Sequence, residues 1–180
     1  MDIKLKNRGF TLIELLTVIM IIGILSSLAM FAFSTAREKA KEAAVLHDLD
    51  VIGSAMRTLV HDTALWPGGQ PAETVCTLAC GLNELCTGAT CAMSLASSSA
   101  GITGTDGSYP NWDGPYMNRI PPDPWGREYF FDTDYSVNAG EEPCDCGGPC
   151  HNVAAIGSFG PESAGNGDYN CEEIIRILAR

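Results

Sequence analysis

The chain has 180 residues, 46% of them hydrophobic, and a formal net charge of −11 at pH 7. This length accommodates one domain together with a membrane helix. Subtracting the +2 of a short basic leader (three basic residues against Asp2) leaves about −13 on the rest of the chain. Such an acidic surface repels phosphate groups, so we expect no nucleic-acid partner.

The amino-terminal segment joins this basic leader to a long apolar run. Three basic residues stand between Met1 and Gly9, and Glu14 is followed by nineteen residues, Leu15–Phe33, without a charge. About 20 apolar residues are needed to cross the hydrocarbon layer of a membrane. The basic residues predict a cytoplasmic amino terminus and a remainder that is exported. Glu14 is costly to bury in a membrane, so it requires a compensating partner.

Lys-Asn-Arg-Gly at 6–9, followed by Phe-Thr-Leu-Ile-Glu-Leu-Leu at 10–16, resembles the class III signal of type IV pilins and pseudopilins. The resemblance implies that a prepilin peptidase of the inner membrane cleaves after Gly9 and methylates the new amino terminus at Phe10. It also implies a homopolymer in which Glu14 pairs with the amine of a neighbouring subunit. No Ala-x-Ala-like site follows the apolar run, which argues against ordinary secretory cleavage.

The apolar run continues into an amphipathic segment. Ser34–Asp62 contains no proline, and five apolar residues recur at spacings of four, three, four and three: Val45, Leu49, Ile52, Met56 and Leu59. We expect one helix from about Thr11 to His61, about 75 Å long. Residues 10–33 form its membrane or filament-core half, and residues 34–65 its amphipathic half. A small sheet must cover the amphipathic stripe. The expected fold class is α+β, a type IV pilin-like fold.

The segment 66–180 forms the exported globular domain. It carries all eight cysteines: Cys76, Cys80, Cys86, Cys91, Cys144, Cys146, Cys150 and Cys171. This distribution favours disulfide bonds in an oxidising compartment. The Cys-x-x-Cys spacing of redox and zinc motifs is absent, and eight cysteines allow 105 pairings, so no pair is assigned.

The remaining elements of this domain are expected from composition and patterning. Residues 94–107 resemble a flexible loop because they are rich in Ser, Gly and Thr. We expect antiparallel strands at 128–131, 153–159 and 171–178, with an insertion at 136–152. For 171–178 a helical turn is the alternative to a strand.

Two short motifs precede the first expected strand. Gly-Pro-Tyr at 114–116 and Asp-Pro-Trp-Gly-x-x-Tyr at 123–129 resemble the signature of the major pseudopilin of type II secretion systems. As a fold signature, the resemblance implies that Trp125 and Tyr129 fill the groove between helix and sheet.

The loop 158–173 carries oxygen-bearing side chains separated by glycines, a composition that suits calcium. It resembles the calcium loop of the pseudopilin family. This resemblance implies a backbone ligand from Phe159, side-chain ligands from Glu162, Asp168 and Asn166, and a terminal carboxylate from either Glu172 or Glu173. The alternative is a solvated acidic loop clamped by a disulfide through Cys171.

The sequence contains no catalytic constellation, so we predict that the chain is not an enzyme. Three functions stay open. The first is the major pseudopilin of a type II secretion system, working with minor pseudopilins and an inner-membrane assembly platform. The second is a surface type IV pilin or minor pilin for adhesion or motility. The third is a membrane-anchored binding module that does not polymerise.

Overall fold

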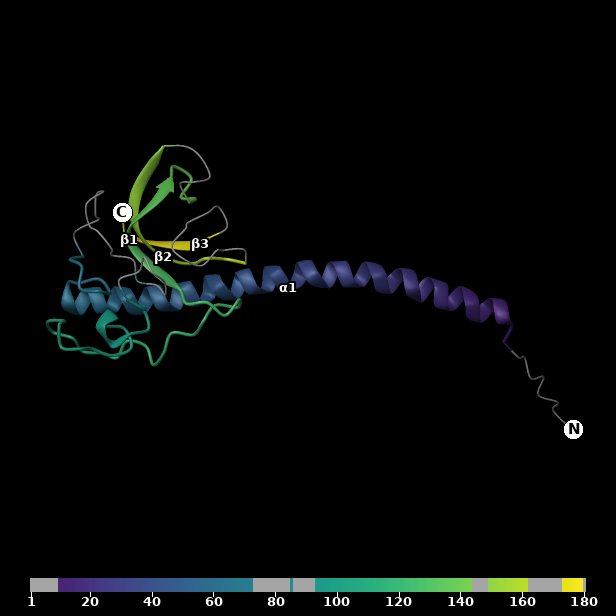
Figure 1. The fold of residues 1–180 in the computed structure, drawn as a ribbon, viewed down its shortest axis with the longest axis horizontal. Helices are drawn as coiled ribbons and strands as arrows, with labels where there is room; N and C mark the ends of the chain where they lie inside the picture. Colours follow the sequence, from purple (N-terminus) through teal and green to yellow (C-terminus); the bar gives the residue numbers. More distant parts are fainter. Residues whose placement is uncertain (1–9, 73–84, 86–92, 144–148, 162–172, 180) are drawn as a thin grey trace, which may run out of the picture. The chain divides into compact units, whose positions relative to one another are not determined.

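The computed structural model describes residues 10–72, 85, 93–143, 149–161 and 173–179. It contains a long helix, a short 3₁₀ helix and a three-stranded sheet (Figure 1). In chain order the elements are α1 (Leu12–Thr63), η1 (Ser98–Ala100), β1 (Phe130–Asn138), β2 (Cys150–Ser158) and β3 (Ile174–Ala179). The chain divides into two compact units, residues 1–40 and residues 41–180. This arrangement confirms the predicted α+β fold class.

Helix α1 has 52 residues, and both of its ends lie within two residues of the predicted ones. The five apolar residues of the predicted stripe (Val45, Leu49, Ile52, Met56 and Leu59) are all fully buried. The helix ends where Ala64 adopts a left-handed φ of 60°, a conformation common just beyond a helix C-terminus. The Thr63 hydroxyl supports this end by donating a 2.7 Å hydrogen bond to the carbonyl of Leu59.

The three strands pair antiparallel in the order β1-β2-β3. Their bounds correct the prediction. The first strand begins at Phe130 and continues to Asn138, into the segment that the sequence suggested was an insertion. The second strand likewise begins earlier, at Cys150, and the third later, at Ile174. Backbone pairing of Asn138 with Cys150 extends both β1 and β2 beyond their apolar residues. A prediction from hydropathy alone therefore made both strands too short.

The sheet is buried on both faces among the described residues, which explains the weak alternation of its sequence. Phe131 of β1 and Ile156 of β2 join the main core on the helix side. Phe130, Tyr135 and Val137 of β1 join a second core on the opposite face. A register shift between Asp132 and Tyr135 changes which face the later residues of β1 occupy. Such a bulge adds one residue to the strand and so inverts its alternation.

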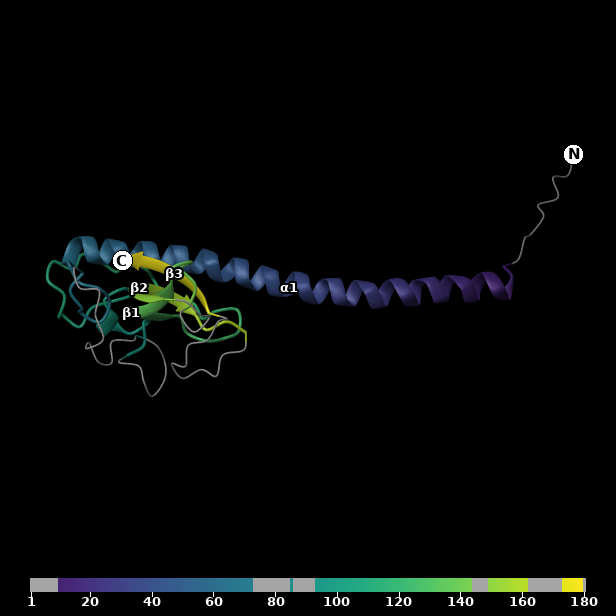
Figure 2. The same ribbon diagram turned by 90° about the horizontal axis from the view of Figure 1, so that it is seen from above.

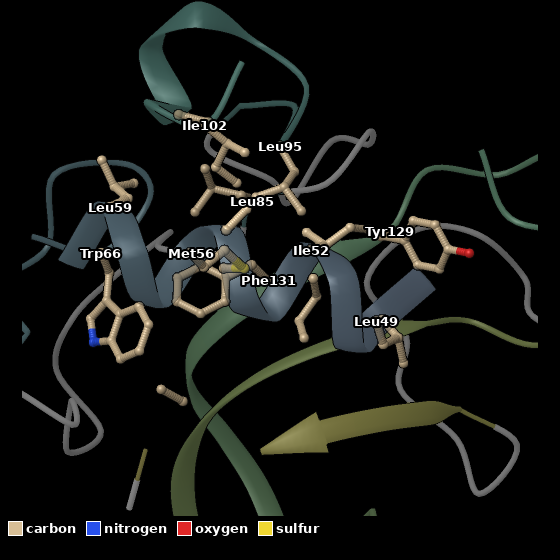
Figure 3. Packing of buried hydrophobic residues seen from close by; sticks show 14 of the residues in the cluster. Leu49, Ile52, Met56, Leu59, Trp66, Leu85, Leu95, Ile102, Tyr129 and Phe131 are labelled. Carbon is tan, nitrogen blue, oxygen red and sulfur yellow. The ribbon is translucent and has the colours of Figure 1, made fainter. Parts of the chain in front are cut away.

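The main core surrounds the amphipathic half of α1. Figure 3 shows Leu49, Ile52, Met56 and Leu59 of the helix among side chains from the sheet and from the loop segments. Leu95, Ala100 and Ile102 are almost completely buried in this core. The expectation of a flexible loop at 94–107 is therefore wrong, because its few apolar residues pack against the helix.

Within the unit of residues 41–180, strand β3 lies along α1, as the two ribbon views in Figure 1 and Figure 2 together show. Gly53 permits this approach, since a Cβ atom at this position would lie 3.0 Å from Cδ2 of Leu178. Beside this contact, the Arg176 guanidinium donates two hydrogen bonds to the Asp50 carboxylate, at 2.8 and 3.2 Å. Both side chains are substantially exposed, so the ion pair contributes little to stability and serves to align the strand.

Candidate assembly site

The start of α1 is closed by a capping box between Thr11 and Glu14. Oε2 of Glu14 accepts hydrogen bonds from the backbone N–H of Thr11 at 2.9 Å and from its hydroxyl at 2.8 Å. The N–H of Glu14 in turn donates to the Thr11 hydroxyl at 3.3 Å. Thr-x-x-Glu at N-cap and N3 satisfies amide groups that have no partner inside the helix. Thr11 therefore begins the helix and holds the Glu14 carboxylate.

Glu14 was predicted from the sequence as a site residue, whereas Thr11 was not. The predicted partner of the acid lay in another molecule, but the structure supplies an intramolecular partner three residues earlier. The signal was present, since Thr followed three residues later by Glu and an apolar run is a helix-start pattern. Both of these hydrogen bonds are to Oε2, and the Thr11 groups do not use the other oxygen, Oε1.

The first half of α1 presents an apolar surface to its surroundings. The exposed large side chains of this half are Leu12, Ile13, Leu15, Leu16, Val18, Ile19, Met20, Ile21, Ile22, Ile24, Leu25, Leu28, Met30 and Phe33. By length and composition α1 is able to cross a membrane. A surface of this kind requires a lipid or protein environment.

Phe10 lies just before the helix and is 88% exposed. Gly9, the residue predicted to precede the cleaved bond, lies outside the described residues. The Phe10 side chain therefore shares the apolar, unburied character of the helix that follows it.

The Asp-Pro-Trp-Gly segment at 123–126 forms a turn that is fixed by a single buried carboxylate. Asp123, only 3% exposed, accepts hydrogen bonds from the backbone N–H groups of Trp125 at 3.0 Å and Arg127 at 2.8 Å. Its other oxygen accepts a 2.7 Å hydrogen bond from the Ser158 hydroxyl at the end of β2. Gly126 takes a φ of 85°, the left-handed conformation that the turn requires. Asp123 thus ties the turn to the sheet.

The two aromatic residues of this block both contact helix α1. Tyr129 is completely buried, and its hydroxyl donates a 2.8 Å hydrogen bond to Oδ2 of Asp48. Burial raises the pKa of Tyr129, and the hydrogen bond to Asp48 raises it further. Trp125 packs against the main core, and the Lys41 ammonium lies 5.5 Å from the centroid of its ring. Both aromatics thus occupy the region between helix and sheet that the motif implied.

The other predicted site residues are only partly described. Cys150, at the start of β2, is disulfide-bonded. The other seven cysteines lie outside the described residues, as do the candidate calcium ligands Glu162, Asn166, Asp168 and Glu172. Phe159 is buried against Phe130, with ring centroids 4.7 Å apart. The Glu173 carboxylate is buried and accepts a 2.7 Å hydrogen bond from the Tyr135 hydroxyl.

A shallow groove lies beside α1 and has a volume of about 450 Å³. It is lined by His47, Asp50, Val51, Ser54, Ala55, Thr58, Tyr116 and Met117. Within the part of the chain that the structure describes, no three His, Cys, Asp or Glu side chains are grouped to hold a metal ion.

Two family models match separate parts of the chain. The model of the prokaryotic N-terminal methylation motif matches residues 4–30, which include the capping box and the beginning of the apolar helix. The model described as type II secretion system (T2SS), protein G matches residues 99–143, which include the turn at 123–126 and strand β1. No solved structure matches the chain.

Curated relatives extend the similarity over most of the chain. The chain is 31% identical over 124 residues to type II secretion system core protein G of Klebsiella pneumoniae, covering 69% of this chain and 73% of the relative. It is also 31% identical to the Escherichia coli K12 protein of the same name, covering 76% and 75%. The Vibrio cholerae protein of that name is 28% identical, covering 70% of each. The chain therefore belongs to the type II secretion system protein G family and is a pseudopilin subunit.

Proposed function

We propose that this chain is the major subunit of a pseudopilus, a homopolymeric filament that drives protein export through a type II secretion system. One observation supports the proposal most directly. Phe10 and the first half of α1 together expose fifteen large apolar side chains next to a single capped carboxylate. A membrane covers that surface before assembly, and identical helices cover it in a filament. A repeated head-to-tail contact that does not close generates a fibre.

We further propose that the precursor lies in the inner membrane with residues 1–9 in the cytoplasm and residues 66–180 in the periplasm. The prepilin peptidase cleaves after Gly9 and methylates the amine of Phe10. Minor pseudopilins and an inner-membrane assembly platform then receive the mature subunit. The basic leader supports this orientation, because positive charge stays on the cytoplasmic side.

The geometry of Glu14 is compatible with two partners at once. Thr11 contacts only Oε2, and a carboxylate accepts about four hydrogen bonds in all. The amine of Phe10 in a neighbouring subunit is then able to bind Oε1 while the capping box stays intact. Thr11 thus prepares the carboxylate for the intermolecular bond, and the charge pair offsets the cost of an acid in an apolar filament core.

The test is the assembly of Glu14 variants in cells that carry the secretion machinery. We expect Glu14→Ala to abolish recovery of this chain in sheared filaments and to stop secretion, while the variant remains in the membrane. Glu14→Asp, which keeps the charge, is the matched control and should retain partial assembly. Mass spectrometry of the wild-type subunit should find an N-methylated Phe10 terminus. Normal filaments from Glu14→Ala would refute the assembly role.

We also propose that calcium and disulfide bonds hold the carboxyl-terminal loop. The Tyr135 hydroxyl anchors Glu173 at the end of this loop, and a nearby cation offsets the cost of burying a carboxylate. Phe159, Glu162, Asn166, Asp168 and Glu172 complete the proposed ligand set, all of them hard oxygen donors. Chelation with EGTA should lower the thermal midpoint of the oxidised protein, and added calcium should restore it. An unchanged midpoint would mean that calcium does not stabilise the loop and that only the disulfide bonds hold it.

A further inference from the structure

The groove beside α1 lies between the helix and the loop that contains Tyr116 and Met117. Its helical residues run from His47 to Thr58. All of its lining residues belong to the unit of residues 41–180. The groove is therefore a feature of the exported domain alone.

The loop side of the groove is held in a fixed position. The backbone N–H groups of Tyr116 and Met117 donate hydrogen bonds to the carbonyl of Ile102, at 3.0 and 3.3 Å. The Tyr116 ring packs edge-on against Trp112, with ring centroids 5.9 Å apart, and its hydroxyl interacts with Asp62. A partner that binds here meets a preformed surface, so little binding free energy is lost in ordering the loop.

The groove carries almost no net charge, although the chain is strongly acidic. With histidine neutral, Asp50 is the one charged residue among the described residues that line it. Its carboxylate accepts hydrogen bonds from the Arg176 guanidinium at 2.8 and 3.2 Å. The Thr58 hydroxyl is also engaged, since it donates to the carbonyl of Ser54 at 3.0 Å. Two acidic proteins repel each other where their carboxylates meet, so a neutral surface is where two copies approach most easily.

Leu46 and Val51 make this face of α1 apolar as well as neutral. Among the described residues of the unit 41–180, they are the only exposed large hydrophobic side chains, at 37% and 43%. Val51 lines the groove. Leu46 lies four residues before Asp50, which also lines it, and residues four apart are neighbours on a helix. Exposed apolar side chains that gather at one groove indicate a protein contact.

The size of the groove indicates what kind of contact it makes. Eight described residues line it, whereas a stable interface between two free proteins uses about 20–30 residues on each side. A contact this small is weak between free molecules, and it becomes effective when both partners are held together at a high local concentration. Copies of this chain that are packed in one filament meet that condition.

We propose that the groove receives the exported domain of a neighbouring copy in the pseudopilus, as a second contact besides the apolar helices. The groove of one copy binds a different surface of the next, so the contact is heterologous and repeats along the filament. This inference rests on the homopolymeric filament proposed above. Another protein in the groove is the competing outcome of the test.

Photo-crosslinking of the full-length chain, in cells that carry the secretion machinery, tests the proposal. The photoreactive residue p-benzoylphenylalanine replaces His47, the first helical residue of the groove, or His151, an exposed histidine of β2 outside it. We expect position 47 to yield severalfold more crosslinked dimer in sheared filaments than position 151. Mass spectrometry of the crosslinked peptides should identify the partner as the same chain. Equal yields at the two positions, no dimer, or crosslinks to other proteins alone overturn the proposal.

A second pair of variants obstructs the groove without a probe. Ser54→Trp places a large ring in the lining, and Ser136→Trp is the matched control at an exposed serine of β1 outside the groove. We expect Ser54→Trp to lower the yield of sheared filaments about tenfold relative to its membrane content, because every subunit meets the obstruction. Ser136→Trp should assemble like wild type. Both serines are exposed, so thermal unfolding should find both variants as stable as wild type. Equal filament yields from the two variants overturn the proposal.

Assembly of the wild-type chain distinguishes the two possible failures. If the wild type forms filaments and position 47 gives no self-crosslink, the filament function stands and the groove contact is refuted. If the wild type forms no filaments, the proposed function fails and the inference fails with it.

Discussion

The hydroxyl of Tyr129 donates a 2.8 Å hydrogen bond to Oδ2 of Asp48, joining residues 81 positions apart in the sequence. This bond connects helix α1 to the segment immediately before β1. It explains why a tyrosine ends the Asp-Pro-Trp-Gly-x-x-Tyr motif, since a phenylalanine of similar size lacks the donor.

Tyr129→Phe should lower the free energy of unfolding by about 1–2 kcal/mol, because it leaves the Asp48 carboxylate without this donor. Water reaches the half-buried Asp48 and limits the loss. Urea unfolding of the full chain in detergent, followed by circular dichroism, measures the change. Asp48→Asn keeps an acceptor for the tyrosine and should cost less. A Tyr129→Phe protein as stable as wild type would contradict the role assigned to this bond.

Alkaline pH should destabilise the exported domain. Burial is the main cause that raises the pKa of Tyr109, Tyr116 and Tyr129. In the unfolded chain these groups ionise near the ordinary value of about 10. Their contribution to stability is therefore complete below about pH 10 and is lost as the pH rises further, because unfolding then releases protons. Unfolding midpoints measured from pH 8 to 11 should fall mainly above pH 10, and less so in Tyr129→Phe. A midpoint that stays constant up to pH 11 would contradict the prediction.

Gly157→Ala should destabilise the sheet. A Cβ atom at Gly157 in β2 would lie 2.5 Å from Cζ of Phe130 and 3.0 Å from the backbone oxygen of Ile174. These contacts allow little relaxation, so we expect a loss of about 3 kcal/mol, at the upper end of the cost of overpacking. At Gly104 the nearest atom to an added Cβ is 3.6 Å away. Gly104→Ala is therefore the matched control and should change stability by less than about 0.5 kcal/mol. Thermal unfolding of both variants tests the difference.

Thr11→Ala should reduce filament assembly without preventing membrane insertion. The substitution removes the hydroxyl that donates to Glu14 and leaves only the backbone hydrogen bond to hold the carboxylate. Thr11→Ser retains the hydroxyl and should assemble like wild type. The yield of sheared filaments, normalised to the subunit content of the membrane, provides the measurement. Equal yields from the alanine and serine variants would show that the capping hydroxyl does not contribute.

The amino-acid sequence by itself determined the helix, the membrane segment and the family. The spacing of Val45, Leu49 and Ile52 fixes which face of α1 is buried, because a helix places residues three and four apart on one side. The short signal around Gly9 and Glu14 indicated the pilins and pseudopilins together, and the Asp-Pro-Trp-Gly-x-x-Tyr motif at 123–129 favoured a pseudopilin, since both motifs are read without tertiary context.

The tertiary structure decided the contacts that no local pattern specifies. The bulge between Asp132 and Tyr135 redirects the side chains of β1, and the core around α1 orders the loop that contains Ile102. The pairing of Lys41 with Trp125 joins residues far apart in the chain. Such contacts depend on which segments meet in space, whereas periodicity reports only the preferences of neighbouring residues.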